Sequence, residues 1–249
     1  MSLIWLFLRT IKKIHFMKKI TIMAALLSSG LFFSQEFLQA ADTFSHKEIV
    51  YLTLNDGKEL QGTVHDIDRE KGLIEEIVIR DGNNKKVKLK PEDVKFMYLM
   101  PTNLSKLANA IEAVSEVNNY TDTRLNNALL GKGYVYFENV PVMVKKKRLT
   151  LLMQLVNPTF SSKIKIYHDP RAKESTSIGI GALKVAGGID KSYYISKNND
   201  VAYKIEKSDY EKAFGPMFQS CSTLVDKYKS DVNWRDLEKH IYDYTTQCN

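Results

Sequence analysis

The chain has 249 residues, of which 44% are hydrophobic and 26% are charged, and its formal net charge is +7. Residues 1–41 carry five basic residues and one acidic residue, so the rest of the chain has a net charge of +3, which does not indicate a nucleic-acid partner. The remaining residues, about 208 in number, suffice for one large domain or two small ones, and no low-complexity tract or clear repeat interrupts them.

The N-terminal region has the order of charge and hydrophobicity that is typical of a secretory signal peptide. Met17 is followed by two lysines, an apolar run of 14 residues (20–33) and then small residues. A membrane-spanning helix needs about 20 apolar residues, which this run does not supply.

We therefore assign residues 1–41 to a signal peptide that starts at Met17. Cleavage is expected after Ser34 or near residues 40–41. Under this interpretation residues 1–16 come from an upstream start, and an uncleaved N-terminal anchor is the alternative. No cysteine lies near either cleavage position, so lipid attachment to a cysteine there is excluded.

Residues 42–101 alternate between β-rich segments and turn residues, which predicts a small β-barrel. Asp56-Gly57 suits a type I′ hairpin turn, residues 81–84 suit a second hairpin, and Gly62 suggests a bulge or a sharp bend. The pattern resembles SH3-like or Sm-like barrels, which host many unrelated functions. The strands are expected over residues 48–54, 58–67, 72–80, 85–90 and 95–100, with one helical turn over 91–94.

The next segment, residues 102–123, is predicted to be a linker helix. Its apolar residues recur on one helical face, and Asn103 suits the N-cap position. Residues 118–123 form the boundary with a second module, residues 124–249, which we expect to be α+β with a mainly antiparallel sheet.

The second module begins with strand-like sequence. In residues 133–158, Pro141 marks an edge or a break, and a short helix over 149–156 is the alternative to a strand. Residues 163–169 alternate between lysine and isoleucine before "YHD", which predicts another strand. Residues 192–207 predict a hairpin that turns at Asn198-Asn199-Asp200.

A C-terminal helical hairpin is predicted after the sheet. Ser208 with Glu211 has the spacing of a capping box, and Asn233 caps the last helix. Gly215-Pro216 is expected to kink the first helix. The apolar residues of these helices recur on one face: Tyr210, Phe214, Phe218, Leu224, Trp234, Leu237, Ile241 and Tyr244.

The two cysteines of the chain, Cys221 and Cys248, both fall on these apolar faces. An exported chain meets an oxidising compartment, where two cysteines normally pair. A reactive thiol pair would usually have the C-x-x-C spacing, which is absent. We predict a structural disulfide that stabilises the fold by roughly 3–4 kcal/mol.

Several familiar motifs fail on inspection, so we predict no catalytic residue, no metal and no cofactor. Residues 65–72 lack the glycine and the bidentate acid of a calcium loop, and residues 179–188 lack the third glycine of a dinucleotide-binding loop. The histidines have no zinc-ligand spacing. His168 and Asp169 are adjacent in a strand and should point to opposite faces, which argues against a dyad.

Two groups of residues are candidates for binding. The densest basic run is Lys145, Lys146, Lys147 and Arg148, which suits either an anionic surface or a solvated hairpin tip. The other group is Lys191, Tyr193 and Tyr194. The two tyrosines should point to opposite faces of the sheet, so core packing is the alternative to ligand binding.

The C-terminal half resembles a module of uncharacterised exported proteins of Bacteroidota. The resemblance covers roughly residues 130–249 and is carried by "LLMQLVNPTFSSKIKIYHDP", "GGIDKSYYISKNNDVAYKIEKSDYEKAFGPMFQSC" and the closing W-x-x-L…Y-x-x-x-C. The "FFSQ" end of the apolar run is similar to signal peptides of that group. The resemblance implies export and lineage, and it implies no catalytic residue because the family has no assigned activity.

These observations lead to three functional hypotheses. The first is an exported envelope protein, in the periplasm or at the outer-membrane surface, that serves as a binding or structural accessory for an unknown envelope protein or ligand. The second is a hydrolase acting on an envelope polymer, which requires acids or a nucleophile that converge in one pocket. The third is a module that makes weak contact with an anionic membrane surface, in which case binding falls with salt.

Overall fold

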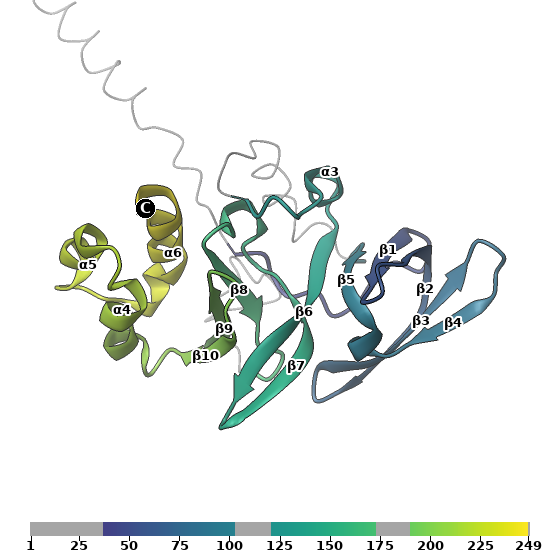
Figure 1. The fold of residues 1–249 in the computed structure, drawn as a ribbon, viewed down its shortest axis with the longest axis horizontal. Helices are drawn as coiled ribbons and strands as arrows, with labels where there is room; N and C mark the ends of the chain where they lie inside the picture. The colour runs from purple at the N-terminus through teal and green to yellow at the C-terminus, as the bar shows by residue number, and fades with distance from the viewer. Residues whose placement is uncertain (1–36, 103–120, 173–189, 249) are drawn as a thin grey trace, which may run out of the picture. The chain divides into compact units, whose positions relative to one another are not determined.

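The computed structural model describes residues 37–102, 121–172 and 190–248. The predicted α+β class with a mainly antiparallel sheet is confirmed, because ten strands form one sheet next to C-terminal helices (Figure 1). The strands are β1 (Ile49–Leu54), β2 (Glu59–Glu70), β3 (Leu73–Asp81), β4 (Lys86–Leu89), β5 (Val94–Leu99), β6 (Val135–Val144), β7 (Lys147–Gln154), β8 (Ile164–His168), β9 (Ser192–Lys197) and β10 (Ala202–Glu206).

The strands follow the order β4-β3-β2-β1-β5-β6-β10-β9-β8, and β7 pairs with β6 outside this path. The five predicted N-terminal strands are all present, with the 3-10 helix η1 (Pro91–Asp93) before β5. The sheet continues from β5 into β6 and is not closed, so the predicted barrel is not confirmed.

The hairpin turns differ in type from the prediction. At Asp56-Gly57 only the glycine has a positive φ, +85°, whereas a type I′ turn needs two such residues. A two-residue turn in which both residues have a positive φ occurs at Lys71-Gly72, between the paired residues Glu70 and Leu73. The turn predicted around Asn198-Asn199 is confirmed, and both asparagines adopt positive φ.

Gly62 lies in a regular stretch of β2, paired with Val50 of β1 and Asp81 of β3. The irregularities of β2 fall later, between Val64 and Asp66 and after Asp68. The sequence expectation of a bulge at Gly62 is therefore wrong, and a glycine is needed at this position for another reason. A Cβ atom at this position would lie 2.2 Å from the Arg80 carbonyl oxygen, so only glycine allows β2 and β3 to approach this closely.

Strand β6 joins the two halves of the sheet. One of its edges pairs first with β5, as far as Glu138, and then with β10 in a parallel ladder from Val142. Pro141 lies between these two partners, so its missing N–H leaves no ladder bond unmade. The other edge of β6 pairs with β7. Because β7 covers most of residues 149–156, the alternative of a short helix over these residues is wrong.

The segment from Phe37 to Ala41 is packed into the fold. The Phe37 ring is buried at 5.3 Å from the Tyr193 ring, and the Leu38 N–H donates to the Val156 carbonyl oxygen at 2.6 Å. Gln154 donates from its amide to the Gln39 carbonyl oxygen at 3.0 Å and accepts from the Ala41 N–H at 2.9 Å. This segment therefore belongs to the same compact unit as the sheet.

The C-terminal helices are α4 (Tyr210–Phe218), α5 (Ser222–Tyr228), η4 (Trp234–Asp236) and α6 (Leu237–Gln247). Their predicted apolar faces are confirmed, because these residues are buried in one cluster with β8, β9 and β10. Asn233 caps η4 as predicted, accepting from the Arg235 N–H at 3.0 Å. The predicted capping box at Ser208 does not form, because the N-cap residue is Asp209 and its side chain makes no cap bond.

The predicted disulfide is present and joins the start of α5 to the end of α6. Cys221 is the N-cap of α5 and Cys248 is the C-cap of α6, with their Cα atoms 5.7 Å apart. Both residues are buried in the core cluster that the helices share with the sheet. The bond closes a loop of 27 residues, which fits the stabilisation of roughly 3–4 kcal/mol expected from chain entropy.

Some predictions lie outside the described residues. These are the signal region before residue 37, almost all of the linker helix (103–120) and the whole of the glycine-containing loop (179–188). Within the described part of the chain, no helix has the length and hydrophobicity needed to span a bilayer.

Replacement of Gly62 tests the close approach of β2 and β3. We expect Gly62→Ala to lower the free energy of unfolding by about 1–3 kcal/mol, because the new methyl group meets backbone rather than a flexible side chain. Gly82→Ala is the matched control, since an added Cβ there meets nothing within 4 Å. Urea unfolding followed by circular dichroism gives both values, and equal stability of the two variants would contradict the steric argument.

Candidate functional site

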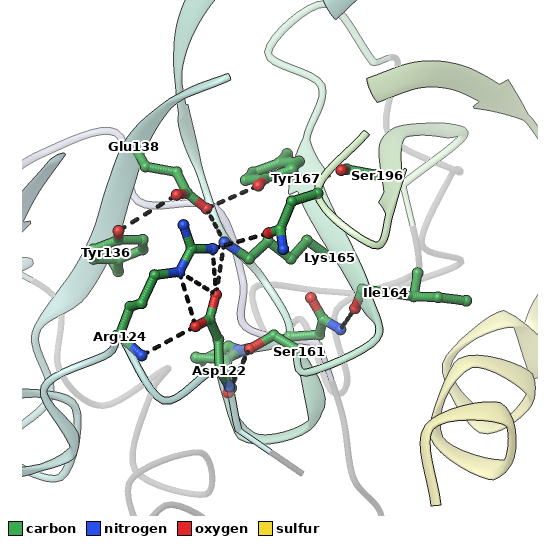
Figure 2. A network of polar contacts seen from close by, with 12 residues as sticks. Asp122, Arg124, Tyr136, Glu138, Ser161, Ile164, Lys165, Tyr167 and Ser196 are labelled. Carbon is green, nitrogen blue, oxygen red and sulfur yellow. Dashed lines mark hydrogen bonds and ion pairs between the residues drawn. The ribbon is translucent and has the colours of Figure 1, made fainter. Parts of the chain in front are cut away.

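The most polar region of the interior is centred on Lys165 of β8. Its side chain is only 4% exposed, and its ammonium group lies 2.6 Å from Glu138 Oε1 and 2.9 Å from Asp122 Oδ2 (Figure 2). Alternation along β8 places Lys165 and Tyr167 on the face opposite to Ile164 and Ile166, which pack against the helices. A buried ammonium group is tolerated here because two carboxylates compensate its charge.

Asp122 connects this lysine to the surface. Arg124 forms a bidentate pair with it, with Nη2 at 2.6 Å from Oδ2 and Nε at 3.0 Å from Oδ1. Burial opposes ionisation of Asp122, but the hydrogen bonds from Arg124 and Lys165 outweigh it and hold the pKa of the carboxyl well below its usual value. Arg124 also donates to Asn199 Oδ1 at 2.9 Å, which links the pair to the β9–β10 turn.

Glu138 of β6 receives two tyrosine hydroxyls in addition to Lys165. Tyr167 donates to Oε1 at 2.8 Å, and Tyr136 lies at 3.5 Å from Oε2 (Figure 2). Burial, followed by the charge of Glu138, raises the pKa of both phenols above the ordinary value, so both remain protonated donors at neutral pH. The Glu138 carboxylate of β6 is thereby linked to Lys165 and Tyr167 of β8.

The chemistry that this network can perform is limited by its own pairing. Both carboxylates accept from cations, and Lys165 donates to both of them, so the charge that a general base or nucleophile would use is already paired. The arrangement suits a rigid link between β6, β8 and the 121–126 segment.

A second polar cluster lies at the other end of β8. The Asp169 carboxylate is buried and accepts from Ser192 Oγ at 2.7 Å, while Lys204 Nζ lies at 3.1 Å. The Ser192 hydroxyl donates a hydrogen bond to a carboxylate and is itself only 3% exposed. Within the described residues it forms no hydrogen bond with a histidine, so it lacks the features of an activated nucleophile. Asp169 and Tyr194 line a small pocket.

His168 does not join that cluster. Its Nδ1 atom lies 3.0 Å from Asp190 Oδ2, whereas Asp169 binds Ser192 and Lys204. The two adjacent side chains have different partners, as the alternation of a strand leads one to expect. In the described residues no three side chains of metal-ligating type are grouped closely enough to hold an ion.

A further buried titratable group is His240 of α6, which is 0% exposed among aromatic rings. Its ring centre lies 4.3 Å from that of Tyr228 and 4.9 Å from that of Phe214, and its Nδ1 atom forms a 2.6 Å hydrogen bond with the Tyr210 hydroxyl. Its Nε2 atom finds no partner in the structure. Burial lowers the pKa of this imidazole from 6.5 to about 4, so the neutral form is the folded form.

The tyrosines that the sequence singled out for binding are core residues. Tyr193 stacks on Trp234 with 6.0 Å between ring centres and accepts from the Asp190 N–H at 3.0 Å. Tyr194 is buried in the cluster on the opposite face of the sheet, as predicted. Lys191 alone of this group is exposed, so the three do not form one surface.

The basic run has a different position. Lys145, Lys146, Lys147 and Arg148 are all exposed at the end of the β6–β7 hairpin, and Lys145 and Lys146 form its turn. The expectation of a hairpin tip is confirmed.

Sequence reasoning did not select Lys165, Glu138 or Asp122, because the pattern of a strand does not tell which of its two faces another segment covers.

Loss of the buried lysine tests the central network. We expect Lys165→Met to lower the free energy of unfolding by about 3–5 kcal/mol, because Asp122 and Glu138 would stay buried beside each other without their shared cation. Arg124→Gln is the control: that side chain is 58% exposed, and a loss below about 1 kcal/mol is expected. A mild effect of the first variant in urea unfolding would mean that the network is hydrated.

His240 makes stability depend on pH. Because the folded-state pKa of about 4 is below the unfolded value of 6.5, the unfolded chain binds the proton more readily, and stability is lost as pH falls through this range. We expect a loss of roughly 3 kcal/mol between neutral pH and pH 4 from this group. In His240→Phe the same decrease in pH should cost correspondingly less. Parallel pH dependences of the two proteins in urea unfolding would refute the assignment.

Comparisons with known proteins add no relative. No protein-family model, no curated protein and no solved structure matches the chain. The candidate function therefore depends on the sequence and on the geometry described above.

Proposed function

We propose that this chain is an exported protein of the cell envelope that acts as a binding or structural accessory rather than as an enzyme. The observation that carries the proposal is the disulfide between Cys221 and Cys248, which is buried and closes the helical end of the fold. Disulfides of this structural kind persist in oxidising compartments and are rare in the cytosol. The basic and apolar order of residues 17–33 supports the same compartment.

The packing of the N-terminal segment favours one of the two cleavage positions. Cleavage near residues 40–41 would remove Phe37 from the core and leave Gln154 without its backbone partners. Cleavage after Ser34 keeps these contacts. The proposed mature protein therefore starts at Gln35, and its resemblance to exported Bacteroidota proteins is part of the same proposal.

The first five strands are proposed to form a small SH3-like module within this protein. The order β4-β3-β2-β1-β5 and the 3-10 helix before β5 support this interpretation. Because such modules host many unrelated functions, this assignment concerns the fold and adds nothing to the proposed role.

The hydrolase alternative receives no support from the described residues. The carboxylates of Asp122 and Glu138, which are 10% and 13% exposed, are neutralised by Lys165 and Arg124. The anionic-membrane alternative is favoured by the exposed basic and apolar side chains at the end of the β6–β7 hairpin.

Alkylation of native protein tests the compartment. We expect protein isolated from envelope fractions to react with a thiol-specific reagent only after reduction, because both sulfur atoms are bonded. Mass spectrometry of the same material should give Gln35 as the N-terminal residue. Free thiols before reduction, or recovery of the chain in the cytosol with residues 17–34 attached, would overturn the proposed export.

A shortened chain provides the matched stability control. A variant that begins at Asp42 should unfold about 3 kcal/mol more easily than one that begins at Gln35, chiefly because it lacks the buried Phe37 ring. Equal urea unfolding midpoints would remove the structural reason for preferring cleavage after Ser34.

A further inference from the structure

The exposed apolar side chains of this protein are concentrated at one place. Within the described residues, four large apolar side chains are exposed, and three of them lie at the β6–β7 hairpin or beside it: Met143 at 39%, Leu149 at 43% and Tyr203 at 39%. Tyr203 of β10 pairs directly with Met143, and Met143 pairs with Arg148 across the hairpin. Leu149 lies opposite Val142, on the other face, so both faces of the hairpin end are apolar.

The same hairpin end carries four consecutive cations. Val144 pairs with Lys147, so the chain reverses at Lys145 and Lys146, and the hairpin end projects beyond β9 and β10 (Figure 1). Within the described part of the chain, none of the residues from Lys145 to Arg148 takes part in an ion pair. Four like charges held together without counter-charges repel one another, and an anionic partner would relieve this repulsion.

Strand direction extends the basic surface around the hairpin. Strand β10 runs parallel to β6, so its C-terminal end lies at the same end of the sheet as the hairpin turn. There the Lys207 N–H donates to the Lys191 carbonyl oxygen at 2.9 Å, which brings two further exposed cations together. Of the nearby carboxylates, Asp169 and Glu206 are paired with Lys204, and Asp190 is bonded to His168. Asp209, the N-cap of α4, and Glu211 in its first turn are further carboxylates that follow β10.

We propose that the end of the β6–β7 hairpin docks on an anionic phospholipid membrane. The cations from Lys145 to Arg148 would lie at the level of the phosphate groups, and Met143, Leu149 and Tyr203 would enter the interfacial layer. Clusters of basic residues are attracted to anionic bilayers, and tyrosine with aliphatic side chains is suited to the interface. The inference deepens the proposed function, since an envelope protein meets such a surface after export.

The apolar residues distinguish a membrane from a soluble polyanion. A soluble polyanion would bind the lysines and arginine chiefly through charge and would gain little from the aliphatic side chains of Met143 and Leu149. A bilayer gains from both, so loss of either set should weaken binding to it. This difference is the basis of the test.

The experiment measures co-sedimentation of the processed full chain with vesicles. Vesicles of phosphatidylcholine with about one third phosphatidylglycerol are compared with pure phosphatidylcholine, at low salt and at about 0.5 M salt, where the Debye length is only a few ångströms. We expect at least tenfold stronger binding to the anionic vesicles at low salt. Binding should fall sharply at high salt.

Three variants separate the contributions. The first neutralises the tip (Lys145→Gln, Lys146→Gln, Lys147→Gln, Arg148→Gln), and the second removes its apolar groups (Met143→Ser, Leu149→Ser, Tyr203→Ser). The third is a matched control that removes the same charge from the β3–β4 region (Lys85→Gln, Lys86→Gln, Lys90→Gln, Lys95→Gln), where no large apolar side chain is exposed. Circular dichroism confirms that each variant is folded.

We expect about tenfold weaker binding for each of the first two variants and little change for the control. Equal loss in the control would mean a general effect of net charge, and unchanged binding of the second variant would mean charge-only attachment. Either result, or equal affinity for neutral vesicles, would overturn the proposal. Because vesicle binding is measured on purified protein, the outcome is independent of whether the chain is exported.

Discussion

The buried ammonium group of Lys165 is the constraint on which the middle of this fold depends. It lies between Glu138 of β6 and Asp122 of the segment that precedes the short helix α3 (Asn127–Leu130), and it is 4% exposed. Several kilocalories per mole are lost when one such ion leaves water, so the group is stable only while both carboxylates remain in place. The position of β8 relative to β6 thus depends on the loop that holds Asp122, which precedes Lys165 by more than 40 residues. This coupling is stricter than apolar packing alone, which tolerates small shifts.

Strand β6 gives that network its setting. It shares one edge between β5 and β10 and gives the other edge to β7, so the antiparallel N-terminal strands and the C-terminal strands belong to one sheet. The chain reinforces this junction with hydrogen bonds that leave the strand. Asn139 donates from its amide to the Pro91 carbonyl oxygen at 2.8 Å, which attaches η1 to the same region. The helices α4 to α6 cover the face of β8 to β10 that is opposite to Lys165. The disulfide links the start of α5 to the end of α6.

The strands, the turns at asparagine and glycine, and the disulfide could be predicted because each depends on local pattern or on composition. The apolar residues of α6 illustrate this, since helical spacing from Trp234 to Tyr244 was enough to place them in the core. The capping box at Ser208 was wrong because the N-cap of α4 is Asp209, and the bulge at Gly62 was wrong because the glycine permits a close approach of two paired strands. Lys165 shows the deeper limit. Lysine next to isoleucine in a strand indicates two faces, but whether a carboxylate covers the lysine is decided by segments distant in the sequence.

The contacts of the N-terminal segment also bear on the order in which the molecule assembles. Ala41 binds the Gln154 side chain across 113 residues, whereas β1 to β4 are joined by hairpins whose partners are close in the sequence. Loop closure over such distances is slow compared with hairpin formation. Residues 37–41 are the earliest described residues to leave a ribosome or a translocation channel, yet the hydrogen-bond partners of Leu38, Gln39 and Ala41 are Val156 and Gln154, at the end of β7 and just after it. The hydrogen bonds that fix this segment can therefore form only after most of the sheet has emerged.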